Sequence, residues 1–191
     1  AAWDAIAWNE ATERVVAGAR LFYFGTLAQR ATVSRETLRR CLEVASEQGV
    51  RRFLDVNLRT PYYDASIIRE SVERCTVLKL SDEELDTVLE SCGVGRGGTS
   101  IDALQALRDR FGLEAVVLTR GPKGALLFTQ DRVVEHPGFP VEVVDTVGAG
   151  DAFSARLAVG LVSGEEIEKT VEEACRLASR VCSRRGAVPD L

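Results

Sequence analysis

One stretch of the chain combines two glycines with two carboxylates in a spacing that suits phosphate chemistry. The residues from Asp145 to Asp151 read Asp-Thr-Val-Gly-Ala-Gly-Asp, after an apolar run and before a helical pattern. Two glycines within three residues let the backbone turn sharply and bring N–H groups close to a ligand. The N-terminus of the following helix adds unpaired N–H groups and the positive end of its dipole. The stretch therefore predicts an anion site, with Asp151 placed to accept a proton from a hydroxyl that attacks phosphorus.

An ordinary strand-to-helix turn is the alternative for the same stretch. In that interpretation Asp151 is a first-turn residue that the helix dipole favours. Glycine-rich turns are common, and the P-loop pattern G-x-x-x-x-G-K-[ST] does not occur in the chain. Residue chemistry alone leaves the two interpretations about equal.

The stretch closely resembles the second signature of the ribokinase-like (phosphofructokinase B type) carbohydrate kinases, D-T-x-G-A-G-D-x-F, which Phe153 completes. The resemblance implies that Asp151 is the general base. It also implies that the loop stabilises charge on the transferred phosphoryl group through Gly148, Ala149, Gly150 and the Asp151 amide.

A monovalent-cation pocket is a further implication of the resemblance. Asp145 and Val147 match the residues that line this pocket. The segment Arg185-Gly186-Ala187-x-Pro189 resembles the C-terminal G-A-x-P turn that closes it, with the Gly186 carbonyl as a candidate K⁺ ligand.

The acceptor side is indicated by two strand-end segments. Phe24-Gly25-Thr26-Leu27-Ala28 resembles the F-G-S-L turn of fructokinases, and Asp55-Val56-Asn57-Leu58-Arg59 resembles their D-x-N-x-R strand. If that strand continues, alternation points Asp55, Asn57 and Arg59 to one side. The resemblance then implies that Arg59 and Asn57 bind the sugar or the transferred phosphate. Polar surface residues at a strand exit are the alternative.

Two further segments resemble nucleotide-side motifs. Lys79 to Glu84 resembles K-x-N-x-x-E, with Ser81 in place of Asn, which implies that Glu84 serves Mg²⁺ and that Lys79 and Ser81 lie at the phosphates. Ser81 and Glu84 also fit a helix capping box, and Lys79 could instead be a solvated strand end. Thr119, Gly121 and Gly124 match the T-x-G-x-x-G turn beside the adenine-ribose site; a turn into a hairpin is the alternative.

The elements that must position these residues alternate between strand and helix. We predict strands at 21–24, 53–57, 76–80, 115–119 and 141–144, and a hairpin of 125–128 with 132–135. Helices are predicted at 10–19, 34–48, 64–72, 81–91, 101–111, 150–162 and 165–183, with Ser34 and Ser81 as N-caps. This order predicts an α/β fold with a mainly parallel sheet, and the resemblance specifies a ribokinase-like three-layer α/β/α sandwich. We predict one domain over residues 1–191.

The composition is that of a globular domain and excludes several other classes. Hydrophobic residues make up 46%, charged residues 28%, and the net charge is −5, so nucleic acid is not an expected partner. Five cysteines without a C-x-x-C pair and a single histidine predict free thiols rather than zinc. No apolar run approaches the roughly 20 residues that span a bilayer, and we expect a cytoplasmic protein without membrane contact.

The resemblance covers the chain from end to end and implies an ATP-dependent sugar kinase. It implies ATP and Mg²⁺ as cofactors and K⁺ as a further one. A homodimer is a candidate assembly, and the sequence does not fix the oligomeric state. Fructose is the leading acceptor, followed by 2-keto-3-deoxygluconate and then ribose or a nucleoside. A non-catalytic nucleotide- or sugar-binding module of the same fold is the alternative of a different class. Because the chain begins with Ala, has no Met and lacks the family's N-terminal Gly-Gly motif, we interpret it as the C-terminal part of a longer kinase.

Overall fold

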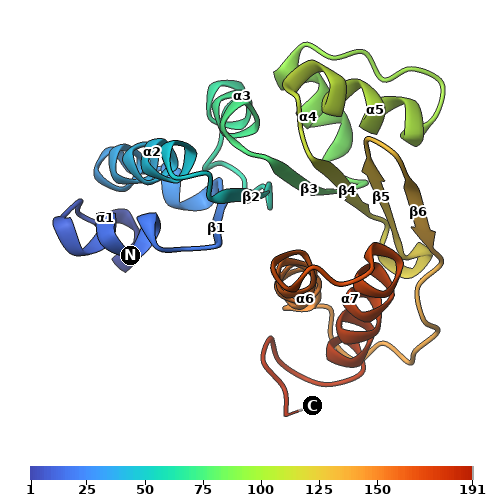
Figure 1. Ribbon diagram of the computed structural model, residues 1–191. Helices are drawn as coiled ribbons and strands as arrows, with labels where there is room; N and C mark the ends of the chain where they lie inside the picture. The colour runs from blue at the N-terminus through green and yellow to red at the C-terminus, as the bar shows by residue number, and fades with distance from the viewer. Residues whose placement is uncertain (191) are drawn as a thin grey trace. The chain divides into compact units, whose positions relative to one another are not determined.

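The alternation of helix and strand predicted from the sequence is present in the computed structural model, which describes residues 1–190 (Figure 1). The strands are β1 (Leu21–Gly25), β2 (Arg51–Asp55), β3 (Val77–Ser81), β4 (Ala115–Thr119), β5 (Ala125–Thr129) and β6 (Val133–His136). The α-helices are α1 (Glu10–Ala17), α2 (Thr32–Glu47), α3 (Ala65–Arg74), α4 (Leu85–Cys92), α5 (Ser100–Phe111), α6 (Ala149–Ser163) and α7 (Ile167–Cys182). Three 3₁₀ turns, η1 (Ala2–Asp4), η2 (Leu27–Gln29) and η3 (Gly121–Lys123), complete the described chain.

The chain forms two compact units, and the division between them falls inside β4. The first unit is Ala1–Val116, and the second begins at Val117. The six strands form one sheet in the order β1-β2-β3-β4-β5-β6. The α/β fold is therefore as predicted, whereas the assignment of one domain stays a prediction.

The strands of the first unit whose pairing is defined are parallel. Leu21 lies opposite Arg51 and Gly25 opposite Asp55, while Asp55 also lies opposite Lys79 of β3. Parallel strands end at the same edge of a sheet. The carboxyl ends of β1, β2 and β3 therefore bring three of the segments with family motifs to one edge.

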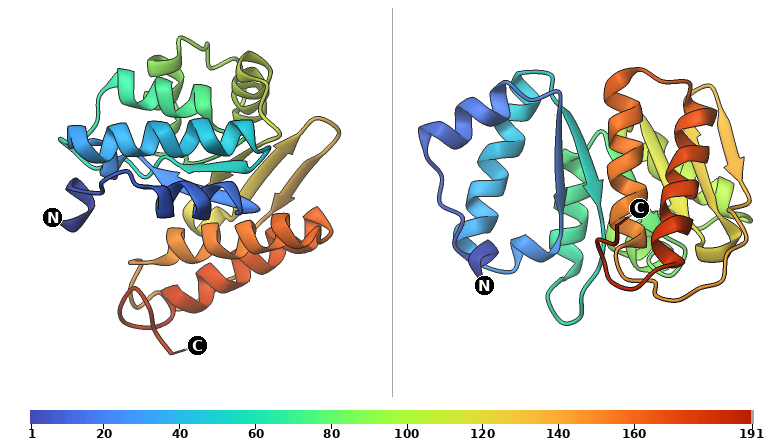
Figure 2. Two further views of the ribbon diagram at one scale, coloured as in Figure 1. Left: turned by 60° about the vertical axis from the view of Figure 1, so that its left-hand side comes forward. Right: turned by 90° about the horizontal axis from the view of Figure 1, so that it is seen from below.

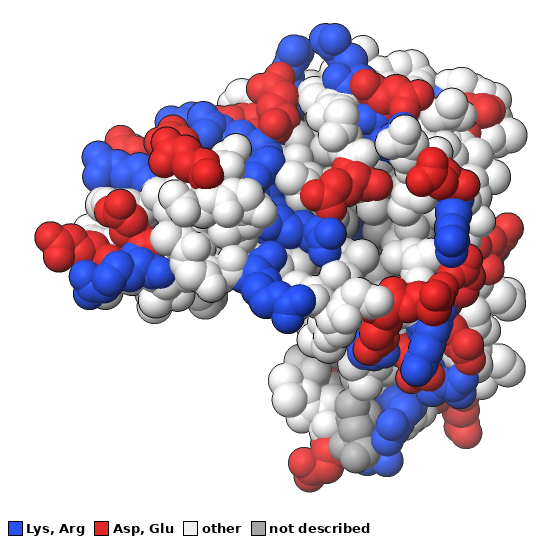
Figure 3. All heavy atoms as spheres, viewed as in Figure 1, with Lys and Arg blue, Asp and Glu red and all other residues white. Residues whose placement is uncertain are grey.

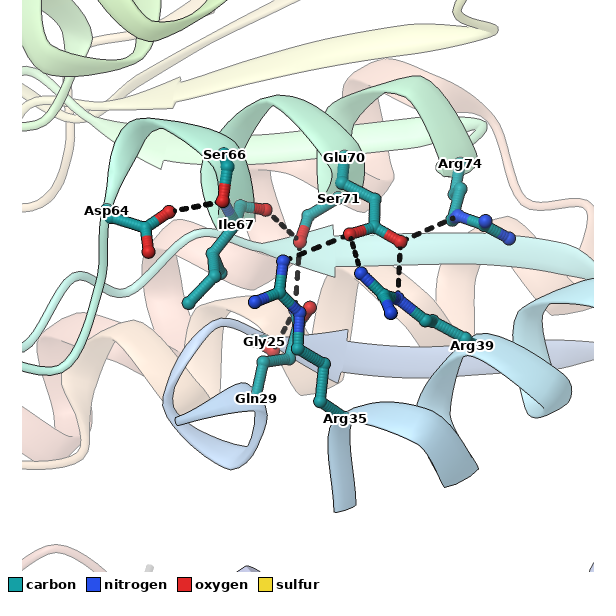
Figure 4. Close-up of polar contacts among 10 residues, drawn as sticks. All are labelled: Gly25, Gln29, Arg35, Arg39, Asp64, Ser66, Ile67, Glu70, Ser71 and Arg74. Carbon is teal, nitrogen blue, oxygen red and sulfur yellow. Dashed lines mark hydrogen bonds and ion pairs between the residues drawn. The ribbon is translucent and has the colours of Figure 1, made fainter. Parts of the chain in front are cut away.

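Helices of the first unit pack on one another through apolar and ionic contacts. α1 and α2 lie side by side (Figure 2) over a cluster of Val16, Cys41, Ala45 and Val50, which Trp8 borders. α2 and α3 are joined by ion pairs from two arginines of α2 to one glutamate of α3, which also pairs with an arginine of its own helix (Figure 4).

In the second unit a hairpin and two long helices pack together. β5 and β6 form the predicted antiparallel hairpin, and its register places Ala125 opposite His136. α6 and α7 lie side by side (Figures 1 and 2). A Cβ on Gly160 of α6 would lie 2.4 Å from Cγ2 of Thr170, so the glycine permits the close approach of the two helices.

The predicted strand at 141–144 is wrong. Residues 141–143 have no regular structure, and Val143 and Val144 are 62% and 51% exposed. The amides of Val144 and Asp145 donate to the carbonyl of Cys182, at 2.8 and 3.2 Å. Their backbone bonds therefore go to the C-terminal end of α7 rather than to a strand ladder.

The predicted N-cap at Ser34 is also wrong. α2 begins at Thr32 after an extended Ala31, so Ser34 lies inside the first turn. Its hydroxyl accepts a bond from the Ile6 amide at 2.9 Å and thereby ties the segment before α1 to α2.

The predictions made from composition concern thiols, metals and membranes. All five cysteines are free, and four of them are buried. Within residues 1–190 there is no group of three or more His, Cys, Asp or Glu side chains that could hold a metal by itself. Over the same residues no helix has the length and apolarity to cross a bilayer. Positive and negative side chains are interspersed over the face that Figure 3 shows.

Candidate active site

The N-terminus of α6 is open to an anion. The helix begins at Ala149, directly after Gly148, which has a φ of 82°, and no side chain of residues 1–190 caps it. The amide of Ala152 makes the first helical bond, to the Gly148 carbonyl at 2.8 Å. Helix geometry leaves the preceding amides, those of Gly150 and Asp151 among them, without an acceptor inside the helix. The exposed carboxylate of Asp151 lies in the same turn, so a base and anion-binding donors share one position.

Gly148 can only be glycine in this arrangement. A Cβ at this position would lie 2.3 Å from the carbonyl oxygen of Ala187, closer than any real contact. The positive φ adds a strain that a side chain would have to bear. The turn at Ala187 therefore packs directly against the glycine loop.

Asp145 fixes the two segments to each other. Its Oδ1 accepts a bond from the Val147 amide and its Oδ2 from the Gly186 amide, both at 3.0 Å. These two bonds hold the pKa of Asp145 below its ordinary value because they favour the charged form. The structure thus brings together Asp145, Val147 and Gly186, the three residues of the predicted cation pocket, and it is the Gly186 amide that faces Asp145.

In the first unit, Lys79 is buried and paired with Asp55. Its Nζ lies 3.0 and 3.2 Å from the two carboxylate oxygens, and the side chains are 7% and 1% exposed. The Tyr23 hydroxyl donates to Oδ2 of Asp55 at 3.1 Å. The alternative of a solvated strand end for Lys79 is therefore wrong. From its sequence Lys79 was expected at the phosphates, and its pairing with Asp55 of the neighbouring strand was not predicted.

The predicted alternation after β2 does not continue. β2 ends at Asp55, and Asn57 has a φ of 41° in the left-handed region, which Asn tolerates better than most residues. Asp55, Asn57 and Arg59 are therefore not on one face of a strand. Asn57 is half-buried and Arg59 is exposed.

Glu84 accepts bonds from two strand exits. Oε1 accepts from the Leu58 amide at 2.7 Å and Oε2 from the Ser81 amide at 2.8 Å. Ser81 is the last residue of β3, residues 82–84 form a turn, and α4 begins at Leu85. The prediction that Ser81 caps this helix is wrong, because the turn separates it from the first helical residue.

The turn after β4 depends on its glycines. Gly121 and Gly124 have φ values of 54° and 76°, and the Arg120 amide donates to the Gly124 carbonyl at 2.8 Å. A Cβ on Gly124 would lie 1.9 Å from the carbonyl oxygen of His136, so β6 leaves no space for a side chain there. Thr119 is half-buried at the end of β4.

The predicted site residues thus form one set in each unit. The first unit carries Asn57, Arg59, Lys79, Ser81 and Glu84. The second carries Thr119, Gly121, Gly124, Asp145, Val147, Gly148, Ala149, Gly150, Asp151 and Gly186. Some residues of each set are hydrogen-bonded to one another: Glu84 to Ser81 in the first unit, and Asp145 to Val147 and Gly186 in the second.

A carboxylate beside open helix amides, on an α/β fold, is chemically suited to binding a phosphate group. A model of the pfkB family of carbohydrate kinases matches residues 2–191, so this chain belongs to that family. The resemblance seen in the motifs is confirmed.

Relatives and a solved structure agree with this family. The chain is 30% identical to fructokinase-2 of Zea mays over 190 residues, which cover 93% of the chain and 55% of that protein. It is 31% identical to a 2-dehydro-3-deoxygalactonokinase of Haloferax volcanii over 165 residues, covering 84% and 50%. A putative ribokinase II from E. coli, solved with ATP and Mg²⁺, superposes with a TM-score of 0.82 at 18% identity, covering 92% and 56%, and shows the ribokinase-like fold. The chain spans about half the length of these proteins.

Proposed function

We propose that this chain carries the catalytic base and the phosphoryl-stabilising loop of an ATP-dependent sugar kinase. The observation that carries the proposal is the uncapped start of α6, where Asp151 stands exposed beside amides that have no helical acceptor. An anion-binding turn alone would not need a carboxylate, and a buried carboxylate could not reach a substrate. The intact Asp151 therefore favours catalysis over a binding module.

In the proposed reaction a sugar hydroxyl attacks the γ-phosphorus of ATP. The new bond joins the sugar oxygen to phosphorus, the bond to the β-phosphate oxygen breaks, and ADP leaves. Asp151 takes the hydroxyl proton, and the amides of Gly150 and Asp151 stabilise charge on the transferred group. The Ala149 amide, also predicted for this role, donates to the Thr146 carbonyl at 3.3 Å.

Magnesium fits the chain through a single carboxylate. Mg²⁺ bound with substrate phosphates uses one or two protein carboxylates and several waters. Glu84, half-buried at the end of the turn after β3, has lone pairs beyond the two that its backbone bonds use. When bound, the metal neutralises charge on the phosphates, and Glu84 would hold it through water.

Fructose is the proposed acceptor. The similarity to maize fructokinase-2 and the F-G-T-L-A and D-V-N-L-R segments support it. The second candidate is a 2-keto-3-deoxy sugar acid, which the Haloferax relative's name favours. Arg59, exposed after β2, suits either acceptor because a guanidinium binds hydroxyls, carboxylates and phosphates.

The proposal is tested by measuring ADP release from the full natural protein with a panel of sugars. We expect turnover with fructose, and Asp151→Asn should lower kcat/KM by about 10²- to 10⁴-fold because it removes the base. Asp131→Asn, in the exposed turn between β5 and β6, is the matched control and should keep the wild-type rate. Equal turnover by wild type and Asp151→Asn contradicts the assignment of the base. ATP binding without turnover supports the binding module.

Activation by K⁺ is part of the proposal, and what supports it is that Asp145, Val147 and Gly186 lie together. We expect the rate to rise with K⁺ and Asp145→Asn to flatten that dependence, since the amide lacks the charge that a cation needs. The measurement is a KCl titration at constant ionic strength, with tetramethylammonium chloride as the balancing salt. A flat wild-type titration rules the cation pocket out.

A further inference from the structure

The segment that leaves β2 is held by bonds from both neighbouring strand exits. The Val56 amide donates to the Lys79 carbonyl of β3 at 3.0 Å. The Val56 carbonyl accepts from the hydroxyl of Thr26, just after β1, at 2.9 Å, and both residues are buried. Val56 is therefore a fixed point from which the acceptor-side segment departs.

A second fixed point follows two residues later, and Glu84 provides it. The Leu58 amide donates to Oε1 of Glu84, and the other oxygen is held by the Ser81 amide. The Glu84 amide donates in turn to the Ser81 carbonyl at 3.2 Å, so the residue is fixed at its backbone as well. Bonds from amides to a carboxylate are about twice as strong as neutral ones. One carboxylate thus ties the exit of β2 to the exit of β3.

Arg59 comes directly after this second anchor. Its carbonyl accepts from the Tyr62 amide at 2.7 Å, so its backbone is held on both sides. Its guanidinium is exposed and, within residues 1–190, donates only to the adjacent Leu58 carbonyl, at 3.1 Å. The backbone of Arg59 is fixed, while most of its side-chain donors remain available.

We infer that Glu84 is a positioning residue for the acceptor segment: its carboxylate holds the Leu58 amide and thereby fixes Asn57 and Arg59 for the sugar. The inference rests on the proposed function, because it concerns the acceptor of that reaction. It gives Glu84 a role in positioning the acceptor segment that is independent of Mg²⁺ binding. Both tasks use the same carboxylate, so the experiment must separate them.

The experiment compares Glu84→Gln with wild type in the full natural protein. Gln offers one acceptor oxygen and turns an NH₂ group toward the second amide, so one of the two bonds is lost. We expect amide hydrogen exchange at Leu58 or Ser81 to become at least about tenfold faster and KM for the sugar to rise about tenfold. The midpoint of thermal unfolding should stay near wild type. The apparent activation constant for Mg²⁺ is measured in parallel, because a change in that constant reports the separate task of Glu84 at the metal. Glu83→Gln, at the exposed neighbouring position, is the matched control and should change none of these.

A double-variant cycle with Arg59→Ala tests whether Glu84 acts through Arg59. If it does, adding Glu84→Gln to Arg59→Ala should change KM for the sugar by less than about twofold. The reason is that Arg59→Ala has already removed the side chain that Glu84 positions. Fully multiplicative effects on KM overturn the inference. So does a variant with a raised Mg²⁺ constant but unchanged KM and amide exchange. If wild type phosphorylates no sugar, the proposed function fails, and unchanged exchange at both amides in Glu84→Gln would still overturn the anchor on its own.

Discussion

Gly148 shows how one residue can determine the geometry of the loop before α6. Its positive φ and the 2.3 Å approach of the Ala187 oxygen act at the same Cα. Gly164, after the end of α6, has a similar φ of 68° but no atom within 4 Å of the Cβ position. A side chain at Gly164 would meet backbone strain alone, whereas a side chain at Gly148 would meet both backbone strain and steric overlap.

We expect Gly148→Ala to be much more damaging than Gly164→Ala. Both variants bear the left-handed strain, about 1–2 kcal/mol. Only Gly148→Ala must also displace the backbone at Ala187 and so disturb the Asp145–Gly186 bond. Urea unfolding should therefore show the larger loss of stability for Gly148→Ala, and phosphoryl transfer should fail only in that variant. Equal losses of stability in the two variants would contradict the close packing of this turn.

Single residues also mark the limit of what the sequence could predict. The turn into α6 was predictable because its glycines and its motif are local in the sequence, although one donor to Asp145 comes from Gly186, 41 residues away. The pairing of Lys79 with Asp55 was not, because it depends on the register between two strands 24 residues apart. Glu84 was predicted to reach back to Ser81, but its bond to Leu58 comes from another strand exit and leaves no local pattern.

At the scale of elements, the same capping pattern has different outcomes at two places. Thr99 and Asp102 form a complete capping box at the start of α5. Ser81 and Glu84 have the same spacing, yet the Glu84 carboxylate is shared with Leu58 and the helix begins only at Leu85. The difference is the tertiary hydrogen bond from Leu58 to Glu84, which occupies the carboxylate at the second place. Tertiary bonds also explain why the strand predicted at 141–144 is absent. The amides of Val144 and Asp145 bond to the end of α7, and this overrides the β propensity of the segment.

The contact between α2 and α3 depends on Glu70, which gathers three arginines (Figure 4). Arg39 approaches it with two bonds of 2.7 Å, and Arg35 and Arg74 lie 3.1 and 3.4 Å away. The hydrogen bonds from Arg39, and then those from Arg35, hold the pKa of Glu70 below its ordinary value. Glu70 therefore stabilises the fold when ionised.

We expect Glu70→Gln to lower the free energy of unfolding by on the order of 1–2 kcal/mol at neutral pH. Because the folded pKa is depressed, this stabilisation is complete above the unfolded pKa of about 4.3 and is lost as pH falls through the folded pKa. The difference between wild type and variant should thus shrink below about pH 4. Urea unfolding from pH 7 to pH 3 measures it. Glu73→Gln, which removes the half-exposed pair with Arg69, is the control and should change stability little at any pH.

At the scale of the whole molecule, the question is whether the two compact units unfold as one domain, as predicted. The boundary between Val116 and Val117 lies inside β4, so neither unit ends at a linker. Both tryptophans, Trp3 and Trp8, are in the first unit, and Trp8 borders its apolar cluster. Tryptophan fluorescence therefore reports on one unit alone.

A variant in the other unit tests this cooperativity. Leu157 is fully buried on α6, and Leu157→Ala should lower the free energy of unfolding by about 2–5 kcal/mol. If the chain is one cooperative domain, the fluorescence midpoint in urea should fall together with the far-UV circular dichroism midpoint, since both then follow a single transition. Val159→Ala, at an exposed position of the same helix, is the control and should leave both midpoints near wild type. An unchanged fluorescence midpoint in Leu157→Ala, with a lowered dichroism midpoint, would show that the unit boundary inside β4 separates two independently unfolding domains.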